Sequence, residues 1–301
     1  MAKTTGIAWC DSTFNPWIGC TRVGPGCDHC YAEQQDSRKR WGGTTHWGSG
    51  VPRHRTSASY WKQPLAWNAQ QEDFRRQGDA PPWNVFCASL ADVFDNEVPE
   101  AWRLDLWTLI ASTPHLSWLL VTKRIGNVKN MAWEGWRERW PDNIRLLITV
   151  CNQEEADRDI PKLLALPCKN GISYEPALGP IQWRWTPYAH EATGESYREY
   201  LDRKGGVNEY EALRKINWII IGGESGPKAR PFDIAWARGA IARCKAAGVP
   251  VFMKQVGSCP IWGDEDSLLG RALREGGYVI KDRAGADPSE WPDDIRIREF
   301  P

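Results

Sequence analysis

The fold of this chain is constrained most by short apolar runs that alternate with segments of helical periodicity after residue 82. The run at residues 216–226, INWIIIGGESG, is typical of a strand that is buried on both faces of a parallel sheet. Residues 232–248 follow at helical spacing and end at Gly248, a residue typical of helix C-termini. The alternation therefore predicts an α/β protein.

The same reasoning predicts six strands, and a short seventh strand precedes a cysteine-rich loop. The predicted strands lie at residues 5–10, 83–92, 115–124, 143–152, 170–181, 216–226 and 249–257. Strands that alternate with helices in this way predict a TIM-like (β/α) barrel, partial or complete, in a single domain over residues 1–301. An open doubly wound sheet is the alternative fold.

Three segments interrupt the alternation. Residues 37–70 form an insertion with six Lys or Arg, four Trp and no acidic residue. Residues 183–214 form a polar insertion between two strands, and an acidic, turn-rich extension begins at about residue 258. The first insertion is the segment most suited to an anionic partner, because it combines cations with flat aromatic rings.

The overall composition limits the classes of partner. The chain has 38 basic and 38 acidic residues, so any affinity for nucleic acid has to be local. The first residues carry no apolar signal segment, and no aliphatic run is long enough to span a bilayer. We therefore expect a cytoplasmic protein with reduced thiols and no membrane partner.

Three of the nine cysteines are clustered in a Gly/Pro-rich loop. Cys20, Cys27 and Cys30 have the spacing C-x6-C-x2-C. A structural zinc site needs four ligands, and the chain has no second C-x2-C pair. Three thiolates on a four-iron cluster would leave one iron open for chemistry. Structural zinc and purely structural thiols remain the alternatives.

Polar residues follow nearly every predicted strand. In (β/α) folds the chemistry gathers at the carboxyl ends of the strands, so we expect these residues to converge on one cavity. The alternative is that they are solvated loop starts. The residues are Ser89, Asp92, Thr122, Lys123, Arg124, Asn152, Gln153, Glu175, Gly222, Gly223, Glu224, Ser225, Lys254 and Gln255.

The loop NPWIGCTRVGPGCDHCYAE resembles the cluster loop of radical S-adenosylmethionine (radical SAM) enzymes, especially that of spore-photoproduct-lyase-like proteins. Nearly the whole chain is similar to a radical-SAM-like family of phage and bacterial proteins. Further motifs that carry this resemblance are SYEPALGPI, IIIGGESGPKARP and DPSEWPDDIRIREFP. The resemblance implies the partial (β/α) barrel of the radical SAM type.

The resemblance also implies cofactors and the residues that bind them. Cys20, Cys27 and Cys30 would ligate a 4Fe–4S cluster whose open iron takes S-adenosylmethionine, and a flavodoxin or ferredoxin would supply the electron. Cleavage of the sulfonium would give a radical that acts on a substrate. The cofactor-binding candidates are His29, Tyr31, Ser89, Asp92, Lys123, Glu175, Gly222, Gly223 and Glu224.

The basic, Trp-rich insertion suggests the substrate. Cations for phosphates and aromatic rings for stacking are typical of single-strand or flipped-base binding, so we expect repair or modification of a nucleic acid or nucleotide. The candidates are Arg38, Lys39, Arg40, Trp41, Arg53, Arg55, Arg124 and Lys254. The alternatives are a lid over a small anionic substrate, a non-enzymatic binding module for nucleic acid or protein with zinc or a vestigial cluster, and a small-molecule SAM-dependent transferase.

Overall fold

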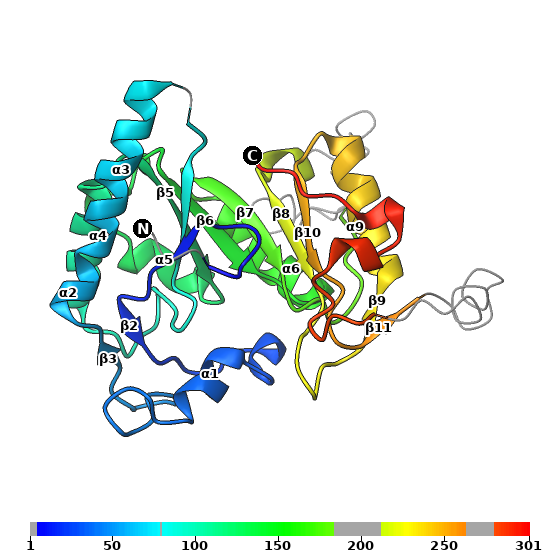
Figure 1. The fold of residues 1–301 in the computed structure, drawn as a ribbon, viewed down its shortest axis with the longest axis horizontal. Coiled ribbons are helices and arrows are strands. Elements are labelled where there is room, and N and C mark those ends of the chain that lie inside the picture. The colour runs from blue at the N-terminus through cyan, green and yellow to red at the C-terminus, as the bar shows by residue number, and fades with distance from the viewer. Residues whose placement is uncertain (1–4, 79, 184–211, 263–279) are drawn as a thin grey trace, which may run out of the picture. The chain divides into compact units, whose positions relative to one another are not determined.

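The computed structural model describes residues 5–78, 80–183, 212–262 and 280–301 (Figure 1). The chain divides into two compact units. The first comprises Met1–Ile148 and Leu166–Lys169, and the second comprises Thr149–Ala165 and Asn170–Pro301. The organisation as a single domain therefore stays a prediction.

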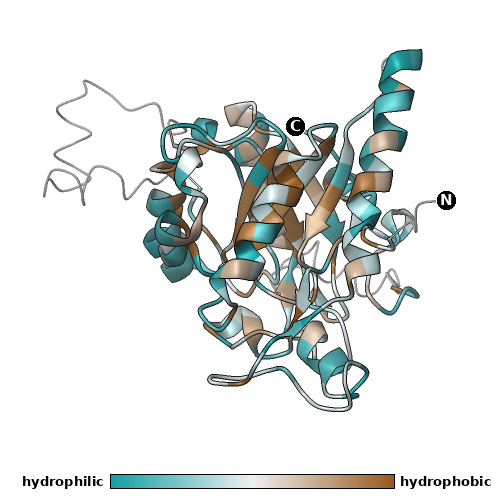
Figure 2. Cartoon of the chain, turned by 90° about the vertical axis from the view of Figure 1, so that its left-hand side faces the viewer, coloured by the Kyte–Doolittle hydropathy of each residue, from teal (hydrophilic) through white to brown (hydrophobic). Residues whose placement is uncertain are grey.

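The first unit contains four strands that pair in parallel. Most residues of these strands are apolar and buried. Figure 2 shows that the strands at the centre of the molecule are largely brown, the colour of hydrophobic residues. Phe86 lies opposite Leu119, and Leu120 lies opposite Leu146, with both leucines of the second pair fully buried. The strands are β1 (Ser12–Thr13), β4 (Trp83–Cys87), β5 (Leu116–Thr122) and β6 (Ile144–Thr149).

The first strand differs from the sequence prediction. Residues 5–10 precede β1 and form a turn in which the amide of Cys10 donates to the carbonyl of Ile7. Pairing begins only at Ser12, which lies opposite Val85. The apolar residues of this stretch are nevertheless used, because the ring of Trp9 is buried with its centroid 4.7 Å from that of Phe86.

Helices connect the strands of the first unit. The helix after β4 continues the predicted alternation of strands and helices, and it buries Leu106, Trp107 and Ile110. Another helix joins β5 to β6, and the remaining ones belong to the cysteine loop and the basic insertion. The bounds are α1 (Tyr31–Asp36), α2 (Ala58–Trp61), α3 (Gln63–Gln77), α4 (Glu100–Ala111) and α5 (Ile125–Met131), with 3-10 turns at η1 (Pro25–Cys27) and η2 (Glu134–Trp136).

The basic insertion is well packed. Its strand β3 (His54–Arg55) pairs antiparallel with β2 (Trp17–Ile18). The ring of Tyr60 stacks on Phe14 with centroids 5.2 Å apart, and Trp67 is buried. These contacts fix the insertion to Phe14 and β2, which precede the cysteine loop.

The second unit repeats the alternation of strands and helices. Its strands β7 (Lys169–Tyr174), β8 (Ile219–Gly222) and β10 (Val251–Gln255) pair in parallel. The helices are α6 (Gln153–Leu164) and α9 (Ile234–Ala247), and Gly248 ends α9 with φ 73°, as predicted. Most of the polar insertion at 183–214 lies outside the described residues, as do residues 263–279 of the predicted C-terminal extension.

The end of the chain packs against the last strand. The amide of Met253 donates to the carbonyl of Ile297, and that of Glu299 donates to the carbonyl of Val251. The chain end therefore covers the edge of β10, a common way of protecting an edge strand. The shorter elements of this unit are β9 (Phe232–Asp233), β11 (Pro260–Ile261), η3 (Leu213–Lys215), η4 (Pro288–Glu290) and η5 (Asp293–Ile295).

The strand order is β1-β4-β5-β6-β7-β8-β10, which follows the chain apart from the short paired strands. Parallel strands in chain order, with helices in several of the described connections between neighbours, form a partial (β/α) barrel of the α/β class, so the predicted fold class is confirmed. Among the described residues, none of the helices combines the length and the apolar character that crossing a membrane requires.

Candidate functional site

The cysteine loop begins beside the carboxyl end of β4. The amide of Gly19 donates to the carbonyl of Leu90 over 3.1 Å, and Gly19 forms a parallel bridge with Ala91. Gly19 has φ +110°, and a Cβ atom there would lie 2.3 Å from the carbonyl oxygen of His46. A side chain would therefore displace the loop, and glycine is what allows Cys20 to lie next to the residues that follow β4.

The three loop cysteines are free thiols. Cys20 follows β2, Cys27 is the last residue of η1, and Cys30 is the N-cap residue of α1. Cys27 is buried, whereas Cys20 and Cys30 are half-buried. The predicted metal ligands therefore lie at both ends of one short loop and at the start of a helix.

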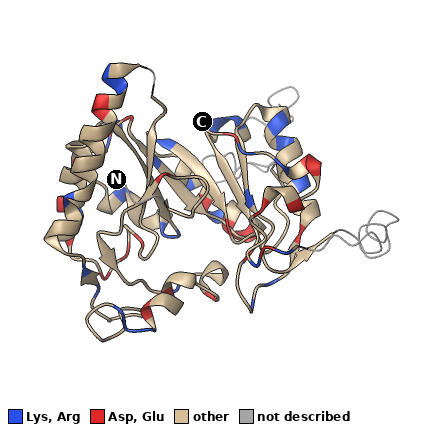
Figure 3. Ribbon diagram, in the orientation of Figure 1, with Lys and Arg blue, Asp and Glu red and all other residues tan. Residues whose placement is uncertain are grey.

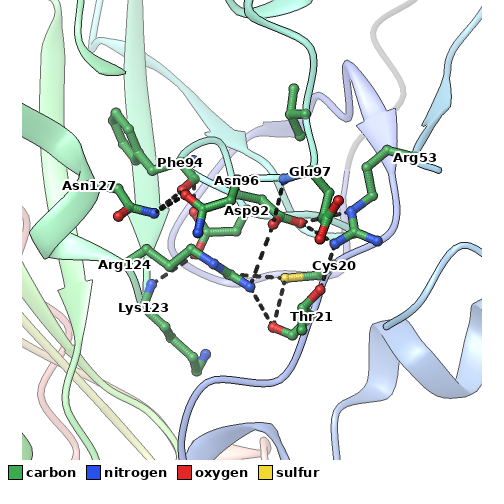
Figure 4. A network of polar contacts seen from close by, with 12 residues as sticks. Cys20, Thr21, Arg53, Asp92, Phe94, Asn96, Glu97, Lys123, Arg124 and Asn127 are labelled. Carbon is green, nitrogen blue, oxygen red and sulfur yellow. Dashed lines mark hydrogen bonds and ion pairs between the residues drawn. The ribbon is translucent and has the colours of Figure 1, made fainter. Parts of the chain in front are cut away.

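Cys20 is held by Arg124, which follows β5 (Figure 4). The guanidinium Nη1 donates to the Cys20 sulfur over 3.2 Å and to a carboxylate oxygen of Asp92 over 3.1 Å. Its Nη2 donates to the carbonyl of Thr21. The side chain of Arg124 is only 6% exposed, so this cation is bound within the protein.

Asp92 is the anchor of this network (Figure 4). Its carboxylate accepts hydrogen bonds from the hydroxyl of Thr122 over 2.8 Å and from the amide of Lys123 over 3.0 Å. The amide of Phe94 donates to the same carboxylate over 2.9 Å. The oxygens of Asp92 therefore bind Arg124 and the residues that orient it, and the cofactor contact expected of Asp92 stays a prediction.

Arg53 ties the basic insertion to the same loop. Its Nε donates to Asp95 over 2.8 Å, and its Nη2 donates to the hydroxyl of Thr21 over 2.6 Å. Its Nη1 donates to the carbonyls of His46, Gly48 and Val51. The side chain is fully buried and holds the loop in place, and the contact with a substrate expected of Arg53 stays a prediction.

Burial dominates the electrostatics of the thiols. It raises the pKa of Cys20 to about 12, Asp92 adds to the rise, and Arg124 opposes it. Burial also raises the pKa of Cys30, and the positive charge of Lys123 acts in the opposite direction. Both thiols are therefore protonated at neutral pH in the protein alone, and binding of a metal would displace their protons.

The donor set fits an iron–sulfur cluster by its chemistry. Three free thiols lie on one loop. Burial is the main cause of the raised pKa of Cys30, and the nearby thiol of Cys27 raises this pKa further. Within the described ranges, however, no group of three or more His, Cys, Asp or Glu residues is arranged around one metal position. Joint ligation therefore needs a shift within residues 20–30, where Gly24 and Gly26 permit one.

Asn15 is a site residue that sequence reasoning did not single out. Its Nδ2 donates to the hydroxyl of Ser89 over 3.0 Å, and its Oδ1 accepts from the amide of Leu90 over 2.8 Å. The hydroxyl of Tyr31 donates to the carbonyl of Ser89 over 2.6 Å. Asn15 thereby links the cysteine loop to the turn after β4, and its place in the NPW motif was the available signal.

In the second unit, an ion pair lies at the carboxyl ends of the strands. Lys254 Nζ lies 2.7 Å from Glu175 Oε2, and the Glu175 side chain is 11% exposed. A Cβ atom on Gly222 would lie 2.9 Å from the same oxygen. Glycine at the end of β8 therefore leaves the room in which Glu175 meets Lys254.

The Gly-Gly-Glu motif has mainly structural contacts in this structure. The carboxylate of Glu224 accepts from the amide and Nε of Arg230 and, through its other oxygen, from Nη2 over 2.8 Å. A Cβ atom on Gly223 would lie 2.4 Å from the carbonyl oxygen of Val256. The motif thus closes a loop, and the cofactor binding expected of it stays a prediction.

The sequence profile of one protein family, described as "Protein of unknown function (DUF5131)", matches residues 4–280. The chain belongs to the DUF5131 family. None of the curated proteins matches its sequence.

Solved structures similar to this DUF5131 protein include three of spore photoproduct lyase. A double mutant with bound AdoMet and dinucleoside spore photoproduct is 13% identical with a TM-score of 0.40 over 73% of this chain. A single mutant is 12% identical with a TM-score of 0.39 over 77% of this chain, and a complex with dinucleoside spore photoproduct is 11% identical with a TM-score of 0.40 over 77%. This chain covers 58% of the length of each lyase chain.

The structure of the DUF5131 protein brings only some predicted site residues together. Cys20, Asp92 and Arg124 are in contact, and Ser89 and Tyr31 are joined by a hydrogen bond. Glu175, Lys254 and the Gly-Gly-Glu motif lie in the second unit. Convergence of all strand ends on one cavity stays a prediction.

The basic insertion presents its cations in two ways. Residues 38–40 follow α1 and are exposed, and the next residue, Trp41, is half-buried, as is His29 in the cysteine loop. Figure 3 marks Lys and Arg along the ribbon in blue. Arg55 instead pairs with Asp105 over 2.6 Å, and its guanidinium lies 4.6 Å from the ring centroid of Trp61. The exposed run at 38–40 is therefore the part of the insertion best placed to meet an anionic partner.

Proposed function

We propose that this member of the DUF5131 family is a radical-SAM-like iron–sulfur enzyme that reductively cleaves S-adenosylmethionine and acts on a nucleic-acid or nucleotide substrate. The observation that carries the proposal is the set of three free thiols, Cys20, Cys27 and Cys30, on the loop beside the carboxyl end of β4. The motif resemblance of this loop and the partial (β/α) barrel add support.

Cys20, Cys27 and Cys30 would hold a 4Fe–4S cluster, which supplies one electron and an open iron position for the amino and carboxylate groups of S-adenosylmethionine. The chain's own residues bind and orient. Arg124 fixes the Cys20 sulfur, and Asp92 fixes Arg124. Because Asp92 and Arg124 are buried, this side of the loop is shielded from water.

Lys123 and Tyr31 are the candidates for contacts with S-adenosylmethionine in the first unit. Lys123 acts electrostatically on Cys30, and in this proposal its cation offsets the carboxylate of the bound amino-acid group. Tyr31 is exposed and directly follows Cys30, and its hydroxyl is oriented by Ser89. In the second unit, Glu175 and Lys254 remain candidates for contacts with S-adenosylmethionine. Their opposite charges suit the ammonium and the carboxylate of its amino-acid group.

The substrate assignment depends on residues 38–40. Three adjacent exposed cations, followed by the half-buried Trp41, suit a phosphate backbone and a stacked base. Arg53 and Arg55 support this segment through buried or paired contacts, and they are not proposed as phosphate contacts. An electron donor such as flavodoxin or ferredoxin is the protein partner that the reaction requires.

The test is anaerobic reconstitution with iron and sulfide. The wild-type chain is expected to turn brown and to hold about four iron atoms, as three thiolates on a 4Fe–4S cluster predict. C20A, C27A and C30A should each lose the cluster, whereas C259A, at a free half-buried cysteine outside the loop, should retain it. A colourless wild-type protein with one zinc ion would reject the proposal.

A further inference from the structure

Arg124 is placed to act on the sulfur of Cys20 in a specific way. Its Nη1 lies 3.2 Å from that sulfur and 3.1 Å from Asp92 Oδ2, and its Nη2 lies 3.8 Å from Asp95 Oδ1 (Figure 4). The side chains of Asp92 and Asp95 are 7% and 2% exposed. The cation is therefore bound among buried groups and does not sample many positions.

The surroundings of Arg124 fix it before any ligand binds. The amide of Arg124 donates to the Thr122 hydroxyl over 2.9 Å, and that hydroxyl donates to Asp92. On the other side, Arg103 Nη2 donates to the carbonyl of Asp95 over 3.0 Å, which holds the turn after β4. These bonds orient the guanidinium toward the cysteine loop.

Cys20 also has a fixed backbone. Its carbonyl accepts a hydrogen bond from the amide of Gly48 over 2.9 Å, and the preceding Gly19 is bound to Leu90. Cys20 is thus the anchored end of the loop. A shift that brings the three sulfurs together is expected to move residues 22–30 and to leave Cys20 and Thr21 in contact with Arg124.

We infer that Arg124 is a positioning residue for Cys20. Arg124 donates an N–H···S hydrogen bond to the ligating sulfur of Cys20 and thereby raises the reduction potential of the cluster. This inference rests on the proposed function. Hydrogen bonds and positive charge at a thiolate ligand stabilise the reduced cluster, because reduction adds negative charge. A potential set in this way decides which electron donors can reduce the protein.

Arginine suits this position better than lysine. The planar fork of Arg124 reaches the Cys20 sulfur, Asp92 and the carbonyl of Thr21 at the same time. A lysine ammonium is a compact charge on a flexible stem, and it replaces the charge without the fixed geometry. The two contributions can therefore be separated by substitution.

The experiment is a redox titration of the reconstituted protein by electron paramagnetic resonance, with iron counted for each variant. R124Q is compared with wild type and with R22Q, since Arg22 is an exposed cation of the same loop that pairs with Glu33 over 2.9 Å. We expect the same iron content in all three. The midpoint potential of R124Q should be more negative than that of wild type. We expect a tenfold change in the equilibrium constant for reduction, which for one electron corresponds to about 59 mV. The R22Q midpoint should stay at the wild-type value.

Three results would overturn the inference, and they are distinguishable. An R124Q midpoint equal to that of wild type, at equal iron content, rejects the inference and leaves the proposed function standing. An equal shift in R22Q rejects it too, because charge alone then sets the potential. A wild-type chain without iron rejects both the inference and the proposed function. If R124Q does not fold, R124K serves in its place. The midpoint potential of R124K should shift in the same direction by a smaller amount. A midpoint equal to that of wild type would overturn the inference.

Discussion

The guanidinium of Arg53 lies 2.8 Å from the carboxylate of Asp95, and both side chains are buried. The two residues are separated by 42 positions in the sequence. Through the same guanidinium, the basic insertion is also bonded to Thr21 at the start of the cysteine loop. The insertion and the loop are therefore parts of one packed substructure, in which the conformation of the loop depends on a buried cation.

Removal of this cation is expected to destabilise the protein. R53Q removes the shorter of the two ion pairs of buried Asp95 and leaves only the 3.8 Å contact with Arg124, and breaking a buried pair in this way typically costs about 3–5 kcal/mol. R38Q is the control, because Arg38 is exposed and surface substitutions usually change stability by less than about 0.5 kcal/mol. Urea unfolding of both variants measures the difference. Equal stabilities would show that the Arg53–Asp95 pair contributes nothing.

Two glycines of the second unit should respond to alanine in opposite directions. In G223A the new Cβ would lie 2.4 Å from the carbonyl oxygen of Val256, so we expect a loss of about 1–3 kcal/mol. Gly239 lies within α9 and has open space around its Cβ position, so G239A should gain about 0.5–1 kcal/mol. Thermal unfolding compares the two. A G223A protein that is as stable as wild type would contradict the close packing at the end of β8.

The carboxylate of Glu224 is expected to matter for stability and not for the cluster. E224Q weakens charge-assisted bonds to Arg230, for which a loss of about 1.5–3 kcal/mol is typical. E72Q is the control, since its pair with Arg76 is largely exposed and such pairs contribute at most about 1 kcal/mol. The iron content of E224Q after reconstitution should equal that of wild type. Loss of iron without loss of stability would assign Glu224 to the cofactor instead.

Binding of single-stranded nucleic acid should depend on the exposed cations after α1. Each phosphate contact contributes about 0.7 to the slope of log K against log salt concentration, so neutralising residues 38–40 together should reduce that slope by about two. The control removes three exposed cations elsewhere in the first unit, Arg75, Arg76 and Arg137. Fluorescence anisotropy over a salt series gives both slopes. A slope that is the same in wild type and the 38–40 variant would reject this segment as the binding surface.

The sequence predicted the buried strands best, because their positions follow from runs of apolar residues. Strands such as β5 and β8 are continuous apolar runs, and burial on both faces of a parallel sheet leaves few other uses for such runs. The position of β1 was missed because its two residues, Ser12 and Thr13, carry no apolar signal and are defined by pairing with β4. Short edge strands of this kind depend on tertiary contacts.

The site was harder to predict than the fold, because its key contacts join distant residues. Arg53 and Arg55 have no acidic neighbours in the sequence, so both were expected to face a substrate, whereas their partners Asp95 and Asp105 come from the region after β4. The contact between Arg124 and Cys20 spans 104 positions and was likewise not visible in the sequence. The cysteine spacing and the strand-end polar residues were the informative local signals.

The central claim is tested most directly by the fate of S-adenosylmethionine on the anaerobically reconstituted protein after one-electron reduction. The account predicts that dithionite-reduced wild-type protein converts S-adenosylmethionine to 5′-deoxyadenosine and methionine, and that C20A, C27A and C30A do not. Formation of S-adenosylhomocysteine in place of 5′-deoxyadenosine, or no turnover by a protein that holds about four iron atoms per chain, would contradict it.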